Sequence, residues 1–153
     1  MISRVLVTLD GSDLAEKVLP YAKDLATRLN AQVVLLRVVE PKMPEMMMSE
    51  FVSAEAIEST AKRTEEEKKE ASDYLSSLAA AWKSEGIDAR WEALEGDPAS
   101  KIIDFARAQQ IDLIAMSTHG RSGLSKLVYG SVADRVLREC GTPILLIKAA
   151  GPR

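Results

Sequence analysis

The chain has 153 residues, 46% of them hydrophobic, which is enough for one full core and hardly for two. A formal net charge of −3 without a basic stripe argues against nucleic acid or an anionic membrane as the main partner. No apolar run reaches the roughly 18 residues of a membrane span, no signal peptide pattern opens the sequence, and the one cysteine, Cys140, cannot form an internal disulfide. We therefore expect a single domain over residues 1–153 in the cytoplasm.

The N-terminal third of the sequence alternates strand and helix signals. Residues 2–9 are rich in Val and Leu and predict a strand, and an Asp-Gly turn follows at 10–13. Residues 32–39 form a second apolar run without alternation, which is typical of a strand covered on both faces. Between them lies a predicted helix in which Pro20 is expected to introduce a kink. Its apolar positions are Leu14, Val18, Tyr21, Ala22, Leu25 and Leu29.

The segment after the second strand is rich in methionine and proline. Residues 40–51 include Pro-Lys-Met-Pro-Glu-Met-Met-Met, which resists regular structure. A mobile lid is one interpretation, and a connector whose methionines cover the edge of the core is the favoured one. Residues 54–86 then predict a long helix with a solvated charged face and with Gly86 as its C-terminal stop. Its expected buried stripe is Leu75, Leu78, Ala79 and Trp82.

The second half of the chain continues the alternation. Strand signals at 87–94, 112–116 and 144–147 are separated by two helices, one beginning after Asp97 and one at Ser131. The prediction is therefore five strands and four helices. Strict alternation of this kind indicates an α/β fold with a parallel sheet and helices on both of its faces.

The loop within residues 116–132, MSTHGRSGLSKLVYGSV, carries the main functional signal. It leaves the C-terminal end of a buried strand, which is where open α/β sheets bind ligands. Its glycines permit close backbone approach, and Ser131 can begin a helix whose free N–H groups attract a phosphate. Ordinary turn glycines are the plainer alternative. His119 and Cys140 have no sequence partners that indicate a catalytic triad or a metal site.

Two segments, VLVTLDGSDLAEKVLPYAKDLA and MSTHGRSGLSKLVYGSVADRVLRECGTPILLIK, resemble the universal stress protein family. Its nucleotide-binding members show Gly, two residues, Gly, nine residues and then Gly-Ser or Gly-Thr. Gly120 and the pair Gly130-Ser131 match this pattern, whereas Ser117 stands where the pattern has glycine. The resemblance implies a flavodoxin-like or Rossmann-like three-layer sandwich with a five-stranded parallel sheet in the order 3-2-1-4-5. It also implies a homodimer paired along the last strand, 144–148.

The resemblance further implies ATP lying across the C-terminal ends of the first and fourth strands. Thr8 and Asp10 would lie near the adenosine, and the Val38 backbone would face the adenine. Met116 and Ser117 would adjoin the ribose, with the Ser117 hydroxyl either crowding the sugar or bonding to it. Asp10 could instead hold a phosphate-bound Mg²⁺ through water, or simply organise its own turn. The residues implied around the phosphates are Gly120, Arg121, Gly130, Ser131 and Val132.

The leading functional hypothesis is a stress-response protein that binds ATP, with Mg²⁺, as a regulatory or sensing ligand. The chain lacks the P-loop pattern GxxxxGK(S/T) and has no conspicuous acid, base or nucleophile set, so slow or no hydrolysis is expected rather than fast turnover. An interaction module that binds no nucleotide and recruits a twin subunit or a client protein through the last strand is the alternative. A phosphohydrolase or AMP-forming enzyme of related fold is the weakest hypothesis.

Overall fold

The computed structural model describes residues 1–44, 52–118 and 130–148. Its centre is a five-stranded sheet in the order β3-β2-β1-β4-β5, in which every neighbouring pair of strands is parallel. This confirms the predicted strand order. The strands are β1 (Arg4–Leu9), β2 (Gln32–Val39), β3 (Ala89–Glu95), β4 (Leu113–Thr118) and β5 (Ile144–Lys148).

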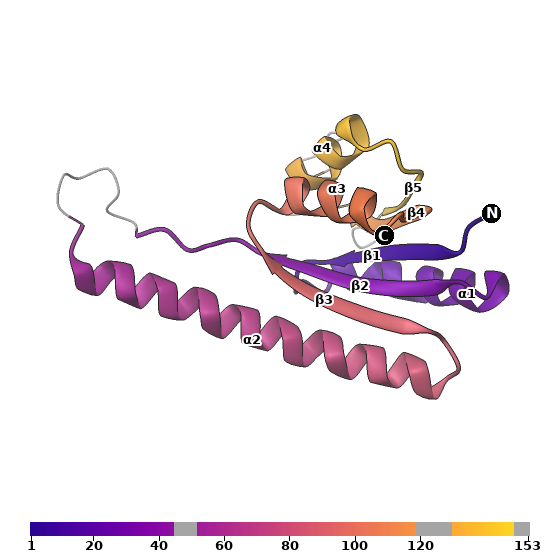
Figure 1. Ribbon diagram of the computed structural model, residues 1–153, viewed down its shortest axis with the longest axis horizontal. Coiled ribbons are helices and arrows are strands. Elements are labelled where there is room, and N and C mark those ends of the chain that lie inside the picture. Colours follow the sequence, from indigo (N-terminus) through magenta and orange to yellow (C-terminus); the bar gives the residue numbers. More distant parts are fainter. Residues whose placement is uncertain (45–51, 119–129, 149–153) are drawn as a thin grey trace, which may run out of the picture.

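Helices cover both faces of the sheet (Figure 1). One layer contains α1 (Leu19–Leu29) and α2 (Ala54–Ser84), and the other contains α3 (Pro98–Ala108) and α4 (Ser131–Glu139). Each layer packs on its own set of buried side chains, one set around Val5 and Val7 and the other around Leu6. The result is the three-layer, flavodoxin-like α/β arrangement expected from the sequence.

The central strand β1 explains why its sequence does not alternate. Val5, Leu6 and Val7 are all fully buried, because helices cover both of its faces. Burying a Val or Leu side chain contributes about 1.5–3 kcal/mol before entropy is counted, so this strand is a major source of stability. The centre of the sheet is therefore well packed on both of its faces.

The start of α1 differs from the prediction. A short 3-10 turn, η1 (Ala15–Val18), precedes the helix, and Pro20 lies in the first turn of α1, where a missing N–H costs nothing. The expected kink was therefore wrong. Two of the apolar positions that recur at helical spacing, Tyr21 and Leu29, are 55% and 44% exposed.

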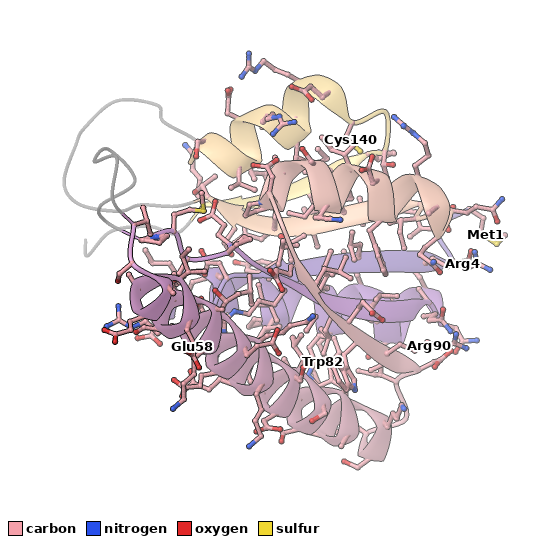
Figure 2. All side chains as sticks on the ribbon, turned by 60° about the vertical axis from the view of Figure 1, so that its left-hand side comes forward. Met1, Arg4, Glu58, Trp82, Arg90 and Cys140 are labelled. Atoms are coloured by element: carbon pink, nitrogen blue, oxygen red, sulfur yellow. The ribbon has the colours of Figure 1, made fainter. Side chains whose placement is uncertain are left out.

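The long helix α2 packs along the sheet mainly with its C-terminal half. Ala71, Leu75, Ala79 and Trp82 are its main buried apolar residues, and Figure 2 shows Trp82 close to the sheet and Glu58 near the other end of the helix. The N-terminal half continues past the sheet beside the end of β2 (Figure 1). Within the described ranges no helix, α2 included, is long and apolar enough to cross a membrane.

Candidate functional site

A cavity of about 500 Å³ lies at the C-terminal ends of β1, β2 and β4. It gathers side chains from distant parts of the sequence, which is the arrangement expected for a ligand site in an open parallel sheet. Gly120 and Arg121, also predicted for the site, lie outside the described residues. The predicted residues that line the cavity are Thr8, Asp10, Val38, Met116, Ser117, Gly130, Ser131 and Val132.

One wall of the cavity is apolar. Leu36 and Val38 from β2 lie on the α3 face of the sheet, together with Met116 from β4 and Ile102 from α3. Pro98, the first residue of α3, completes this wall. A flat apolar group such as a base can be covered here on the side away from solvent.

Asp10 organises the turn at the end of β1. Its Oδ1 accepts hydrogen bonds from the Ser12 N–H at 2.9 Å and from the Ser12 hydroxyl at 2.6 Å. The Ser12 hydroxyl oxygen in turn accepts from the Ala15 N–H at 3.1 Å. These hydrogen bonds show that Asp10 organises its own turn, which was one of the alternatives for this residue. Asp10 also lines the cavity.

Gly11 is required at the next position of this turn. Its φ is +84°, a left-handed conformation that favours glycine, and a Cβ there would lie 2.9 Å from Arg37 Cζ. The guanidinium of Arg37 therefore lies against the turn. Glycine at this point serves both the turn and the close approach of that side chain.

The Arg37 side chain belongs to a charged cluster that the sequence analysis missed. Its Nη2 is 3.4 Å from Glu67 Oε1, and Lys42 Nζ is 3.0 Å from Glu67 Oε2. The Lys42 N–H also donates to the hydroxyl of the buried Thr64 at 3.0 Å. All three charged side chains line the cavity, and they join the end of β2 to α2. The signal that could have pointed to Arg37 is a charged residue inside an otherwise apolar strand.

The start of α4 forms the opposite end of the cavity. Gly130 is the N-cap residue and has no side chain to accept from the first turn, and its carbonyl accepts from the Asp134 N–H at 3.0 Å. Among the described residues, no side chain accepts from an N–H of the first turn of α4. These N–H groups and the positive end of the helix dipole favour an anion next to Ser131 and Val132.

A polar contact fixes α4 against the start of α3. Arg135 Nη1 donates to Asp97 Oδ2 at 2.6 Å, and its Nη2 donates to the Ser100 hydroxyl at 2.8 Å. Asp97 Oδ2 also accepts from the Ser100 N–H and hydroxyl, capping α3 as the sequence predicted. The hydrogen bonds from Ser100 are the main cause of a pKa of Asp97 below its usual value. The hydrogen bond and positive charge of Arg135 lower this pKa further.

Two candidate residues of the sequence remain, His119 and Cys140. His119 lies outside the described residues, and Cys140 is half-buried beside the apolar cluster under α3 and α4. In residues 1–44, 52–118 and 130–148 no three His, Cys, Asp or Glu side chains are grouped so as to hold a metal ion. The geometry is that of a binding cavity with an anion-attracting end.

The family model for the universal stress protein family matches residues 1–148. The chain belongs to this family. Universal stress protein MJ0531 of Methanocaldococcus jannaschii is 32% identical over 151 residues, which cover 97% of this chain and 83% of the relative.

Solved structures show the same architecture. That of MJ0577, also from M. jannaschii, matches with a TM-score of 0.80 at 23% identity, covering 99% of each chain. A universal stress protein from Archaeoglobus fulgidus, solved in complex with dAMP, matches with a TM-score of 0.58 at 23% identity, covering 97% of this chain and 98% of that one. At this level of identity these two structures support the fold of the chain.

Proposed function

We propose that this chain binds an adenine nucleotide, ATP with Mg²⁺ in the first instance, as a regulatory or sensing ligand of a cytoplasmic stress response. The observation that carries the proposal is the cavity itself, because it joins an apolar wall to an open helix start across the ends of adjacent strands. Its volume of about 500 Å³ is in the range of small-molecule sites. The complex of the Archaeoglobus relative with dAMP supports the same class of ligand.

In the proposed complex the adenosine lies over the ends of β1 and β2. The base packs on Leu36, Ile102 and Met116, with the backbone of Val38 at its edge. Thr8 and Asp10 supply polar atoms beside it. Burying the base in this way uses the hydrophobic effect for affinity and the few polar groups for orientation.

The phosphates lie at the start of α4. Backbone N–H groups near Ser131 and Val132 donate to phosphate oxygens, and Gly130 allows the close approach because no side chain intervenes. A hydrogen bond to a charged group contributes about 1.5–3 kcal/mol. Gly120 and Arg121 would add to this cradle, as the family pattern implies.

The Mg²⁺ would arrive with the triphosphate. Magnesium keeps several waters and is bound mainly through phosphates, so the triphosphate would hold the ion while Asp10 stays beside the adenosine. The ion would neutralise phosphate charge beside the carboxylates of Glu40 and Glu67, which also line the cavity. Affinity for ATP should therefore rise when Mg²⁺ is present.

Slow or absent hydrolysis is part of the proposal. Among the described residues that line the cavity, the potential proton-transfer groups are carboxylates and Lys42. His119, the one histidine of the chain, lies outside the described residues. Fast phosphoryl transfer needs a positioned nucleophile or water and a charge-stabilising set. A sensing role needs neither of these.

Isothermal titration of the purified protein with ATP, with and without Mg²⁺, tests the proposal. We expect saturable 1:1 binding, strengthened by Mg²⁺, and phosphate release far slower than nucleotide exchange. A folded protein that shows no binding up to millimolar ATP would refute it. Mass spectrometry of gently purified protein separates it from the interaction-module alternative, since that alternative predicts no co-purifying adenine nucleotide.

We also propose a homodimer through β5. Within the described residues β5 pairs with β4 alone, so its other edge is open, and its four apolar side chains, 144–147, are only half-buried. An open apolar edge strand is a ready template for pairing with a second copy. Sedimentation of the wild type should give a dimer, and Leu145→Lys should shift it to the monomer. A wild-type monomer at micromolar concentration would rule this interface out.

A further inference from the structure

A chain of hydrogen bonds links the end of β1 to β4 beside the cavity. Asp10 accepts from Ser12, and Ser12 accepts from the N–H of Ala15. The carbonyl of Ala15 accepts from the Ser117 hydroxyl at 3.1 Å, across 102 positions of sequence. Ser117 therefore contacts η1 from the neighbouring strand while lining the cavity.

The direction of this last bond determines what Ser117 can offer a ligand. A serine hydroxyl has one proton to donate and two lone pairs to accept with. A carbonyl oxygen can only accept, so the Ser117 proton is the one shared with Ala15. The oxygen of Ser117 is thus left to act as an acceptor toward the cavity.

The position of Ser117 indicates which ligand group it meets. β1 and β4 are neighbours in the sheet, with β2 on the far side of β1. If the base lies against Val38 of β2 and the phosphates lie at the start of α4, the sugar that joins them passes the ends of β1 and β4. Each sugar hydroxyl has one proton to donate, and the Ser117 oxygen can accept it.

We propose that Ser117 is a specificity-determining residue whose hydroxyl oxygen accepts a hydrogen bond from a ribose hydroxyl, so that the cavity prefers ribonucleotides to deoxyribonucleotides. This inference rests on the proposed nucleotide-binding function. Of the two alternatives left open for this position, the proposal takes the one in which Ser117 bonds to the sugar, because the bond to Ala15 fixes the direction of its hydroxyl proton. A glycine at 117, as in the family pattern, has no such acceptor.

The bond to Ala15 is not what holds η1 in place. Ala15 and Val18 are buried, and the Tyr74 hydroxyl donates to Glu16 at 2.5 Å, which fastens η1 to α2 independently. Removing the Ser117 hydroxyl should therefore leave the turn folded. An effect of this removal on ligand choice can then be separated from an effect on structure.

Titrations of the wild type and Ser117→Ala with ATP, 2′-deoxy-ATP and 3′-deoxy-ATP test the inference. We expect the wild type to bind ATP about five- to tenfold more tightly than at least one deoxy analogue, the ratio that one neutral hydrogen bond supplies. Ser117→Ala should lose this preference by weakening ATP alone. Ser117→Gly should lose the preference in the same way. It replaces Ser117→Ala in the test if the alanine variant is not stably folded.

Ser12→Ala is the matched control, because Ser12 contacts Ala15 in the same network but does not line the cavity. It should change the affinities for ATP and its deoxy analogues by a common factor and leave their ratio intact. Equal wild-type affinities for all three ligands, or a ratio that survives in Ser117→Ala, would overturn the inference while leaving nucleotide binding standing. Absence of any nucleotide binding by the folded wild type would instead overturn the proposed function, and this inference with it.

Discussion

Helices α3 and α4 begin beside one another at the same end of the sheet, but only α3 has an N-cap residue whose side chain accepts from its first turn. The first turn of α3 is closed by its own chain, since Asp97 accepts from the Ser100 N–H and hydroxyl. The first turn of α4 follows Gly130, which has no side chain to cap it. Arg135 joins the two starts by bonding to Asp97 and Ser100.

The difference shows how one structural element serves either stability or binding. Every α-helix has free N–H groups in its first turn, and they must find an acceptor. In α3 the acceptor is an internal carboxylate, so the helix start is complete and has nothing to offer a ligand. In α4 the corresponding groups face the cavity, where an external anion can supply the acceptor.

Giving α4 the kind of cap that α3 has should produce the largest effect. Gly130→Asp places a carboxylate at a backbone with φ of −45° and ψ of 153°, which other residues adopt. The new side chain would take the N–H donors and repel phosphate. We expect ATP affinity to fall by about tenfold or more, the loss of one hydrogen bond to a charged group, while stability rises by a few tenths of a kcal/mol. Calorimetric titration and urea unfolding measure the two effects.

Gly141→Asp is the control for this change in charge. Gly141 follows the other end of α4, outside the cavity lining, and a Cβ there would meet no atom within 4 Å. ATP affinity should be close to that of the wild type. Undiminished affinity in Gly130→Asp would show that the start of α4 is not the phosphate end.

Removing the cap of α3 should give the next largest effect, this time on stability. Asp97→Ala deletes the acceptor of the Ser100 N–H and the partner of Arg135. We expect the melting temperature to fall by roughly 2–4 °C, with a smaller loss of ATP affinity because α4 is less firmly placed. Thermal unfolding followed by circular dichroism measures the change.

Asp24→Ala is the control, since Asp24 also pairs with an arginine, Arg28, but caps no helix. Exposed pairs of this spacing contribute little, so its melting temperature should stay near that of the wild type. Equal losses in the two variants would mean that the cap of α3 adds nothing beyond a surface ion pair.

Much of this architecture could be predicted because its signals are local. The Val- and Leu-rich run at 2–9 predicted the strand β1, and the non-alternating run of β2 predicted a strand covered on both faces. The Asp97-Pro98 pair predicted the start of α3. Ser131 was predicted to begin α4, and the structure places it there. The family pattern then directed attention to residues that the structure brings to one cavity.

The parts that could not be predicted depend on contacts between distant segments. Arg37 and Glu67 meet because α2 lies beside β2. No sequence pattern around either residue indicates that the two side chains come into contact. Ser117 contacts Ala15 only because β1 and β4 are adjacent. The kink expected at Pro20 was wrong because helical spacing alone cannot show that η1 ends just before α1 begins.

The smallest expected effect is a change in stability at acidic pH. It depends on the cap of α3, which α4 lacks. Contacts with Ser100, and with Arg135 in addition, lower the pKa of Asp97 in the folded chain below its ordinary value of 3.8. A carboxylate with a lowered pKa stabilises the fold at pH above the unfolded value, and this contribution is lost as pH falls through the folded value. The stability gap between wild type and Asp97→Asn should therefore be full near neutral pH and should close in strong acid. Thermal unfolding of both proteins from about pH 7 to pH 3 measures it.

Asp112 provides an internal comparison for this pH dependence. Its pKa is also lowered, by hydrogen bonds from Ser3 and from the Arg4 N–H, at the other end of the strands β1 and β4. Asp97→Asn should therefore reduce the acid sensitivity of the wild type without abolishing it, and adding Asp112→Asn should reduce it further. A gap between wild type and Asp97→Asn that stays constant down to the acid limit would mean that this carboxylate does not supply the pH-dependent stability. Because Asp97 also holds Arg135 of α4, protonation of this carboxylate should lower ATP affinity by no more than the small loss expected for Asp97→Ala.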